Sequence, residues 1–219
     1  MSENNSIIKM SMLVIISLIM IAAIVVFYVR PYYLAKSLPK AVVIDTSHQP
    51  TIGNTNARLH FVAFEDLKCS NCARFTNEIF PYIQKHFINT GAAKYTFINL
   101  AFIQGSMPAA NAAHCVYKQN KKLFFPWVDY IYKHQPPEDQ NWATIPVLLD
   151  FANKIPGIHT DSLATCLVQR PYDQLIQNNL KQAAKLMPTA VATPTVYING
   201  VVVHPLTKEQ IDTVVAAVK

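Results

Sequence analysis

The sequence predicts an α/β fold in which a long helical segment separates the two halves of one mixed β-sheet. Two strand-like runs, residues 59–65 and 94–100, enclose a helical pattern. Residues 106–187 then show helical spacing broken by prolines. A strand–turn–strand pattern at 195–203 and an amphipathic pattern at 207–218 close the 219-residue chain. The predicted order is therefore β-α-β, a helical block, then β-β-α.

The composition excludes several classes of protein. Hydrophobic residues make up 51% of the chain and charged residues 15%, which excludes a disordered chain. The 14 prolines and 5 glycines follow no period, which excludes a collagen-like repeat, and 4 cysteines are too few for a disulfide-dense scaffold. The charges behind the net +6 are scattered. They fit a solvated basic surface or attraction to an anionic membrane, and we expect no nucleic-acid binding.

Residues 10–29 predict a transmembrane anchor behind a short N-terminal tail, residues 1–9. The run MSMLVIISLIMIAAIVVFYV carries no formal charge and is bracketed by Lys9 and Arg30. A helix of ~20 apolar residues spans the hydrocarbon core of a bilayer. The alternative is a cleaved signal peptide, whose apolar core is usually ~7–15 residues. This run is longer and no small-x-small cleavage site follows it, so we expect an uncleaved anchor.

The remainder of the chain is expected to form a spacer and one domain. Residues 30–57 contain prolines and polar residues and are interpreted as a spacer with one short strand at 41–44. Residues 58–219 form the domain, with the helical insertion at about 106–187. Lys and Arg occur on both sides of the anchor, so charge counting does not settle the topology. A short tail before a signal-anchor helix favours a domain outside the cytoplasm.

The first half of the domain is predicted as a βαβ unit. Residues 59–65 are aromatic and β-branched, and residues 94–100 alternate as a strand does. Between them, apolar residues recur at spacings of three and four: Cys72, Phe75, Ile79, Ile83 and Phe87. Pro81 is expected to kink this helix, and Gly91 to end it. The two strands should be parallel, with a right-handed crossover.

The second half is predicted as helices followed by a hairpin. Five helices are expected near 108–120, 123–134, 143–154, 160–168 and 172–187. The turn Asn199-Gly200 separates two β-branched runs, which is a strong hairpin signal.

The CSNC sequence from Cys69 to Cys72 is the leading candidate site. Its first cysteine falls where a strand meets a helix N-terminus, whose unpaired N–H groups and dipole stabilise a thiolate. Cys72 lies one turn later and can attack a mixed disulfide on Cys69. In a βαβ unit this spacing indicates a redox motif. The alternatives are half of a zinc site, which needs four ligands, and a purely structural bridge. No second CxxC or HxxxH pair is present, and we expect no metal and no cofactor.

Further motifs identify a family. Phe64-Glu65-Asp66 precedes Cys69, Phe75 and Phe80-Pro81 follow the CxxC, and Thr193-Pro194-Thr195 precedes Asn199-Gly200. With the helical segments around Cys115 and Cys166, these motifs make residues 58–218 resemble the DsbA-type thiol:disulfide oxidoreductases of the thioredoxin superfamily. The resemblance implies a thioredoxin-like fold with a helical insertion.

The resemblance also implies roles for particular residues. Cys69 would be the exposed nucleophile and Cys72 the resolving thiol. Pro194 would be a cis-proline facing the CxxC, with Thr193 before it exposed to pair with an extended substrate. Without the family, Pro194 is only a proline at the start of a strand.

Several positions depart from the family pattern. Ser70 replaces a proline of the motif, and Asn71 replaces the histidine of the strongest oxidants, so both are candidates for tuning the redox potential towards a milder oxidant. Ala63 stands where many relatives carry a buried acid. Glu65 and Asp66 are nearby acids, of which Asp66 is interpreted as a cap of the helix region.

Cys115 and Cys166 lie 51 residues apart in the helical block. They are a second redox relay pair, a structural disulfide or two free thiols. Their matching positions in related proteins favour the structural disulfide, which would contribute about 3–4 kcal/mol in the chain-entropy model and fit an oxidising compartment.

Together these features predict a membrane-anchored oxidase that donates its Cys69–Cys72 disulfide to cysteine-containing exported proteins. The family implies reoxidation by a DsbB-like membrane partner, with a single-pass anchor in the bacterial inner membrane and the domain in the periplasm. A reductase or isomerase of the same fold, and a non-enzymatic metal carrier or chaperone, are the alternatives. We expect a monomer.

Overall fold

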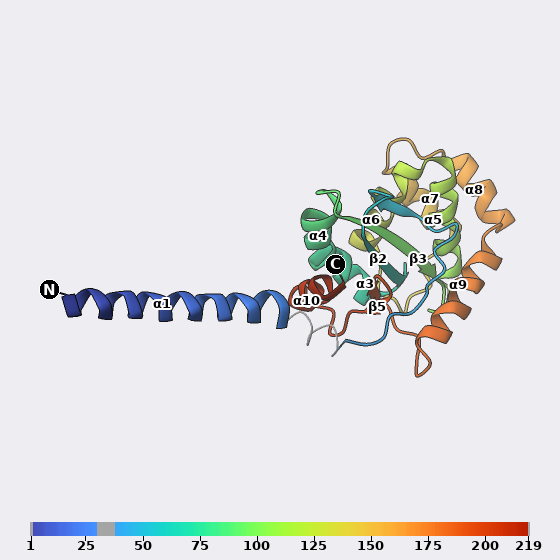
Figure 1. Ribbon diagram of the computed structural model, residues 1–219. Helices are drawn as coiled ribbons and strands as arrows, with labels where there is room; N and C mark the ends of the chain where they lie inside the picture. Colours follow the sequence, from blue (N-terminus) through green and yellow to red (C-terminus); the bar gives the residue numbers. More distant parts are fainter. Residues whose placement is uncertain (1, 30–37, 219) are drawn as a thin grey trace.

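The computed structural model of the protein describes residues 2–29 and 38–218 (Figure 1). Its sheet has the strand order β1-β3-β2-β4-β5. The central strands β2 (Leu59–Asp66) and β3 (Ala93–Leu100) are parallel. β4 (Thr195–Ile198) runs antiparallel to β2, and β5 (Val201–Val202) completes a hairpin. The predicted βαβ unit and closing hairpin are therefore confirmed.

The helices follow the predicted order. The crossover from β2 to β3 consists of α3 (Ser70–Glu78), α4 (Phe80–Ile83) and the π-helical turn η2 (Gln84–Ile88). The helical block comprises α5 (Met107–Gln119), η3 (Lys121–Leu123), α6 (Phe124–His134), α7 (Ile145–Asn153), α8 (Thr160–Gln169) and α9 (Asp173–Leu186), and α10 (Lys208–Val218) follows the hairpin. The break in the crossover falls at Ile79, two residues before Pro81, because a proline fits the first turn of a new helix.

The described part of the expected spacer is joined to the domain. The strand predicted at 41–44 is wrong: Val42 donates one backbone hydrogen bond to Gly200, and the Val43 side chain is 95% exposed. Instead β1 (Thr51–Gly53) pairs antiparallel with β3 as an edge strand. Gly53 adopts φ +90°, and a Cβ atom there would lie 2.5 Å from the Ala93 carbonyl oxygen, so this approach requires glycine.

Both faces of the sheet are covered. Alternate residues of β2 point to opposite faces, so Phe61 and Ala63 enter the larger core while Val62 and Phe64 enter the smaller one. The larger core lies against the crossover helices and the helical block, and the smaller one includes Ala183 of α9. Burial on both faces explains why β2 reads as an almost continuous apolar run.

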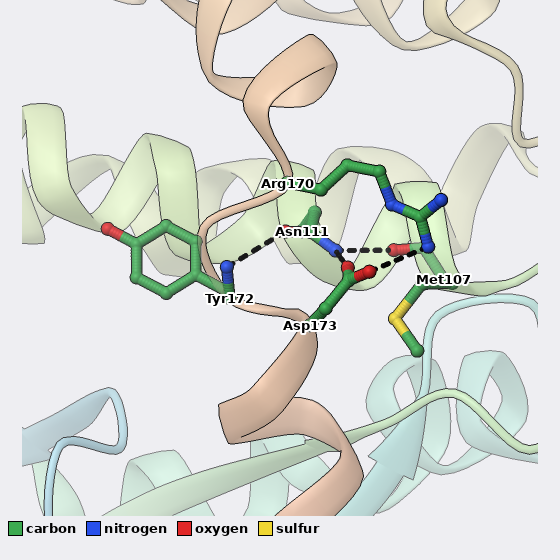
Figure 2. Close-up of polar contacts among 5 residues, drawn as sticks. All are labelled: Met107, Asn111, Arg170, Tyr172 and Asp173. Atoms are coloured by element: carbon green, nitrogen blue, oxygen red, sulfur yellow. Dashed lines mark hydrogen bonds and ion pairs between the residues drawn. The ribbon is translucent and has the colours of Figure 1, made fainter.

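The start of α9 is tied to α5 by a buried amide (Figure 2). The Asn111 Nδ2 atom donates to Asp173 Oδ1 at 2.7 Å and to the Met107 carbonyl at 3.3 Å. Its Oδ1 accepts from the backbone N–H of Tyr172 at 3.2 Å. Arg170, in the left-handed conformation that ends α8, forms an ion pair with Asp173 at 2.7 Å. This cluster fixes the α8–α9 corner against α5.

Cys115 on α5 and Cys166 on α8 form a disulfide that joins two helices of the block. Cys115 is buried in the larger core, and Cys166 packs against it.

At the N-terminus, α1 (Ser2–Ile24) and the π-helical turn η1 (Val25–Val29) include the apolar run 10–29. Judged on the described ranges alone, the chain has no helix with both the length and the apolar character needed to cross a membrane.

Candidate active site

The CxxC lies at the carboxyl end of β2, where the chain turns into α3. Cys69 is the N-cap residue of α3, with extended backbone (φ −71°, ψ 121°). Asp66 builds the preceding turn: its Oδ1 accepts from the Lys68 N–H at 2.9 Å, and its carbonyl accepts from the Cys69 N–H at 2.9 Å. Its Oδ2 accepts from Ser106 Oγ and from the backbone N–H groups of residues 102 and 103. Asp66 therefore anchors the loop after β3 and holds Cys69 at the helix start; it does not cap α3 itself.

The Cys69 thiol is acidified and also covered. Its pKa falls from 9.0 to about 6, chiefly because the Cys72 thiol donates to it, with further help from Thr193 and from backbone N–H groups of the first turn. The Cys69 Sγ atom lies 3.4 Å from the Thr193 carbonyl oxygen. The expectation of an exposed nucleophile is corrected: Cys69 is only 5% exposed, because Thr193 contacts it on one side and Gln135 Nε2 donates to its carbonyl at 3.3 Å on another.

Cys72 has the opposite character. It is fully buried, and burial raises the pKa of its thiol well above the ordinary value. The pair is thus asymmetric, with a thiolate at Cys69 and a protonated thiol at Cys72. This is the arrangement that a nucleophilic and a resolving cysteine require.

Thr193 and Pro194 face the CxxC from the start of β4. The peptide bond between them is cis. A groove of about 300 Å³ runs beside them; its lining includes Asn71, Arg74, Phe75, Thr193, Pro194 and Leu206. The predicted substrate-binding residues and Asn71 of the dipeptide are therefore brought together along one surface.

Glu65 is a site residue that the sequence analysis noted only as a nearby acid, without a role. It is 1% exposed, and burial raises the pKa of its carboxyl to about 7. Tyr95 donates its hydroxyl to Glu65 Oε1 at 2.7 Å, and Thr76 Oγ1 lies 3.5 Å from Oε2. Cys72 and Thr76 are one helical turn apart on α3, so the carboxyl faces the side of α3 that carries Cys72. Glu65 also lines a pocket of about 340 Å³.

A signal for Glu65 was present in the strand period. Ala63 and Glu65 are two residues apart on β2 and share the face covered by α3. Many relatives carry a buried acid at the position of Ala63. In this chain Glu65 supplies the buried acid, two residues further along the same face of β2.

Ser70, one of the two predicted tuning residues, is engaged by a residue from the helical block. Its backbone N–H and its hydroxyl both donate to Glu138 Oε2, at 2.8 and 2.9 Å. The two residues are 68 apart in sequence, and no local pattern indicated the contact. Asn71 contributes its backbone N–H to Cys69.

The described residues were also compared with the requirements of a metal site. Across residues 2–29 and 38–218, no three His, Cys, Asp or Glu side chains are grouped so as to hold a metal ion.

With this geometry established, comparison with known proteins identifies the family. The sequence matches the family described as Thioredoxin over residues 45–217. The chain belongs to the thioredoxin family. Among curated relatives, it is 33% identical to disulfide bond formation protein D of Bacillus subtilis over 156 residues, which is 71% of this chain and 69% of that protein.

Two solved structures are similar to this chain over most of its length. The crystal structure of Chlamydia trachomatis DsbA matches with a TM-score of 0.72 and 31% identity, covering 81% of this chain and 95% of that one. BdbD from Bacillus subtilis in its oxidised form matches with a TM-score of 0.74 and 29% identity, covering 82% and 98%. The predicted class is confirmed: the protein is a DsbA-like protein disulfide oxidoreductase with a thioredoxin-like fold and a helical insertion.

Proposed function

We propose that the protein introduces disulfides into exported proteins through the Cys69–Cys72 pair. The observation that carries this proposal is the asymmetry of the two thiols: Cys69 is acidified at the start of α3, whereas Cys72 is buried and protonated. A cysteine that is stable as a thiolate is a good leaving group, so a disulfide to Cys69 is readily passed on.

The reaction follows from this asymmetry. A substrate thiolate attacks Cys69 Sγ of the oxidised pair, an S–S bond to the substrate forms, and Cys72 leaves as a thiolate that takes up a proton. Glu65, which faces this side of α3, supplies the proton. The second substrate thiolate then attacks the substrate sulfur of the mixed disulfide and releases Cys69. Two substrate thiols are oxidised and the enzyme disulfide is reduced.

Thr193 and Pro194 are proposed to hold the substrate. The Thr193 carbonyl lies beside Cys69 Sγ, and the adjoining groove runs along α3. An extended segment placed there would bring its cysteine to Cys69, with backbone hydrogen bonds that do not depend on its sequence.

The N-terminal helix is proposed to anchor the domain to a membrane, with residues 10–29 as the anchor. Its side chains from residue 12 to residue 26 are apolar, apart from Ser17, and exposed around the helix. A helix that is apolar on all sides needs an apolar environment. The Cys115–Cys166 disulfide favours an oxidising compartment, so we place the domain in the periplasm of a bacterium, with a DsbB-like membrane partner as the oxidant that restores the Cys69–Cys72 disulfide.

A disulfide reductase is the second candidate, because one contact favours it. The Glu138 carboxylate sits on Ser70 at the start of α3, where an anion weakens the case for a strong oxidant. Redox potential separates the two: we expect a value between those of thioredoxin, about −270 mV, and DsbA, about −120 mV. A value below the thioredoxin example would favour the reductase.

The deciding experiment is a single turnover with a peptide that contains two cysteines. Oxidised full-length protein in detergent should convert one equivalent of the dithiol peptide to its disulfide, as mass spectrometry reports. Active reduction of insulin without peptide oxidation would replace the oxidase with the reductase. Fractionation of the full chain, with carbonate washing of membranes, tests the anchor, which is wrong if the washed protein is released.

A further inference from the structure

The segment between α6 and α7 contacts the CxxC. Gln135 Nε2 donates to the Cys69 carbonyl, and three residues later Glu138 Oε2 accepts two hydrogen bonds from Ser70. Glu138 is exposed, so its carboxylate is ionised at neutral pH, and its hydrogen bonds with Ser70 hold its pKa below the ordinary value.

This contact places two anionic groups on one helix start. The first N–H groups of α3 are the donors that stabilise a thiolate at Cys69. The N–H groups of Asn71 and Cys72 donate to Cys69, and Glu138 binds the N–H of Ser70 beside them. When Cys69 ionises, its negative charge forms next to Ser70, the residue that binds the Glu138 carboxylate. Repulsion then opposes the thiolate, and so opposes the reduced form of the pair.

Other charges near the CxxC leave this repulsion in place. Lys68 is buried with its Nζ donating to the Gln104 carbonyl, and it lines the same pocket as Glu138 and Asp139. Glu65 faces α3 from β2 and adds negative charge when ionised. Among the described residues that line this pocket, Lys68 is the one cation beside the carboxylates of Glu138 and Asp139. Arg74 and Glu78, which carry opposite charges, line the groove beside Thr193 and Pro194.

We propose that Glu138 sets the redox potential of the Cys69–Cys72 pair by binding Ser70, and that its charge makes the disulfide a weaker oxidant than it would otherwise be. Glu138 is a positioning residue that acts through Ser70. The proposal rests on the function proposed above and adds how its driving force is tuned from the helical insertion.

A simpler role for Glu138 is that of a helix cap. An acceptor at the first turn stabilises a helix whether or not it is charged, and the charge itself adds a modest dipole effect. The two roles separate in Glu138→Gln, which keeps an oxygen acceptor of the same length and removes the charge. A cap alone predicts an unchanged redox potential, whereas the tuning role predicts a change.

The test uses full-length protein and its Glu138→Gln variant, equilibrated with glutathione buffers. We expect the variant to favour the reduced form about three- to tenfold more, which is roughly 15–30 mV towards a stronger oxidant. The pH dependence of Cys69 alkylation should show a lower pKa in the variant. The difference should shrink in high salt, because Glu138 is exposed. Asp139→Asn is the matched control: it removes a neighbouring carboxylate that lines the same pocket, and it should leave the potential unchanged.

Equal potentials for wild type and Glu138→Gln, or a weaker oxidant in the variant, would overturn the proposal. An equal shift in Asp139→Asn would also overturn it, since the effect would then be one of general charge. Thermal unfolding of both oxidised variants checks that they fold, and Glu138→Ala, which also removes the charge, must shift the potential in the same direction. Failure of the proposed function is distinct: wild-type protein would then fail to oxidise the dithiol peptide while still equilibrating with glutathione.

Discussion

The four cysteines form two pairs in contrasting settings. Cys69 and Cys72 lie in one turn at the junction of β2 and α3, whereas Cys115 and Cys166 join two helices across 51 residues. Exposure does not separate them, because Cys69 is more buried than Cys166. What differs is the set of donors that surround a sulfur. Cys69 receives hydrogen bonds from the Cys72 thiol and from the start of a helix, and these acidify it. In this protein, the predicted reactivity of a cysteine follows from its hydrogen-bond donors.

The largest expected effect tests the first pair. Cys69→Ala should abolish peptide oxidation, whereas Cys72→Ala should accumulate mixed disulfides with substrate, because the resolving thiol is gone. Non-reducing gels and mass spectrometry of the full-length variants would show both results. Full oxidase activity in Cys69→Ala would disprove the assignment of the nucleophile.

Removing the second pair should change stability and leave the chemistry intact. Cys115→Ala with Cys166→Ala should lower the free energy of unfolding by about 3–4 kcal/mol in the chain-entropy model. Denaturant unfolding and peptide oxidation are the two measurements. The contrast between the pairs fails if this double variant loses oxidase activity while its stability is unchanged, since that result indicates a redox relay.

Glu65, which lies beside the first pair, should make the stability of the folded protein depend on pH. Its carboxyl pKa is about 7 in the folded protein, above the ordinary value of 4.5, because burial disfavours the charge. The folded state therefore binds the proton more tightly, and stability should fall as pH rises from about 4.5 to 7. Glu65→Gln removes this loss, so the oxidised variant should be more stable than wild type by up to roughly 3 kcal/mol at pH 8, with no such gain from this titration near pH 4.

Unfolding of oxidised protein across this pH range is the measurement, because the disulfides then do not titrate. Thr76→Val is a matched control, since it removes a weak contact with Glu65 and keeps the carboxyl. A gain from Glu65→Gln that is the same at pH 4 and pH 8 would contradict the raised pKa.

Much of the fold could be predicted because its signals are local. The strand patterns, the five helices of the block and the hairpin at Asn199-Gly200 each depend on neighbours in sequence. The CxxC could also be placed at a helix start from its position after a strand. Local signals fail where a contact is remote: β1 is fixed by pairing with β3, and Glu138 meets Ser70 across 68 residues. The cover over Cys69 comes from Thr193 and Gln135, so a family pattern alone suggested an exposed thiol.

The smallest effect is expected at the α8–α9 corner, four residues after Cys166. The Arg170 side chain is mostly exposed, so its ion pair with Asp173 should contribute at most about 1 kcal/mol. Arg170 also has φ 51°, a conformation that costs a non-glycine residue about 1 kcal/mol.

Arg170→Ala should therefore be slightly destabilising, whereas Arg170→Gly loses the ion pair but relieves the backbone and should stay near wild type. Both should oxidise peptide at the wild-type rate, because Arg170 contacts the backbone of Cys166 and the side chain of Asp173, and neither contact involves α3 or the CxxC. Denaturant unfolding would measure the ranking. If Arg170→Gly were the less stable of the two, the free energies assigned to the ion pair and to the backbone conformation would be wrong. Slower peptide oxidation in either variant would show that the two cysteine regions are coupled.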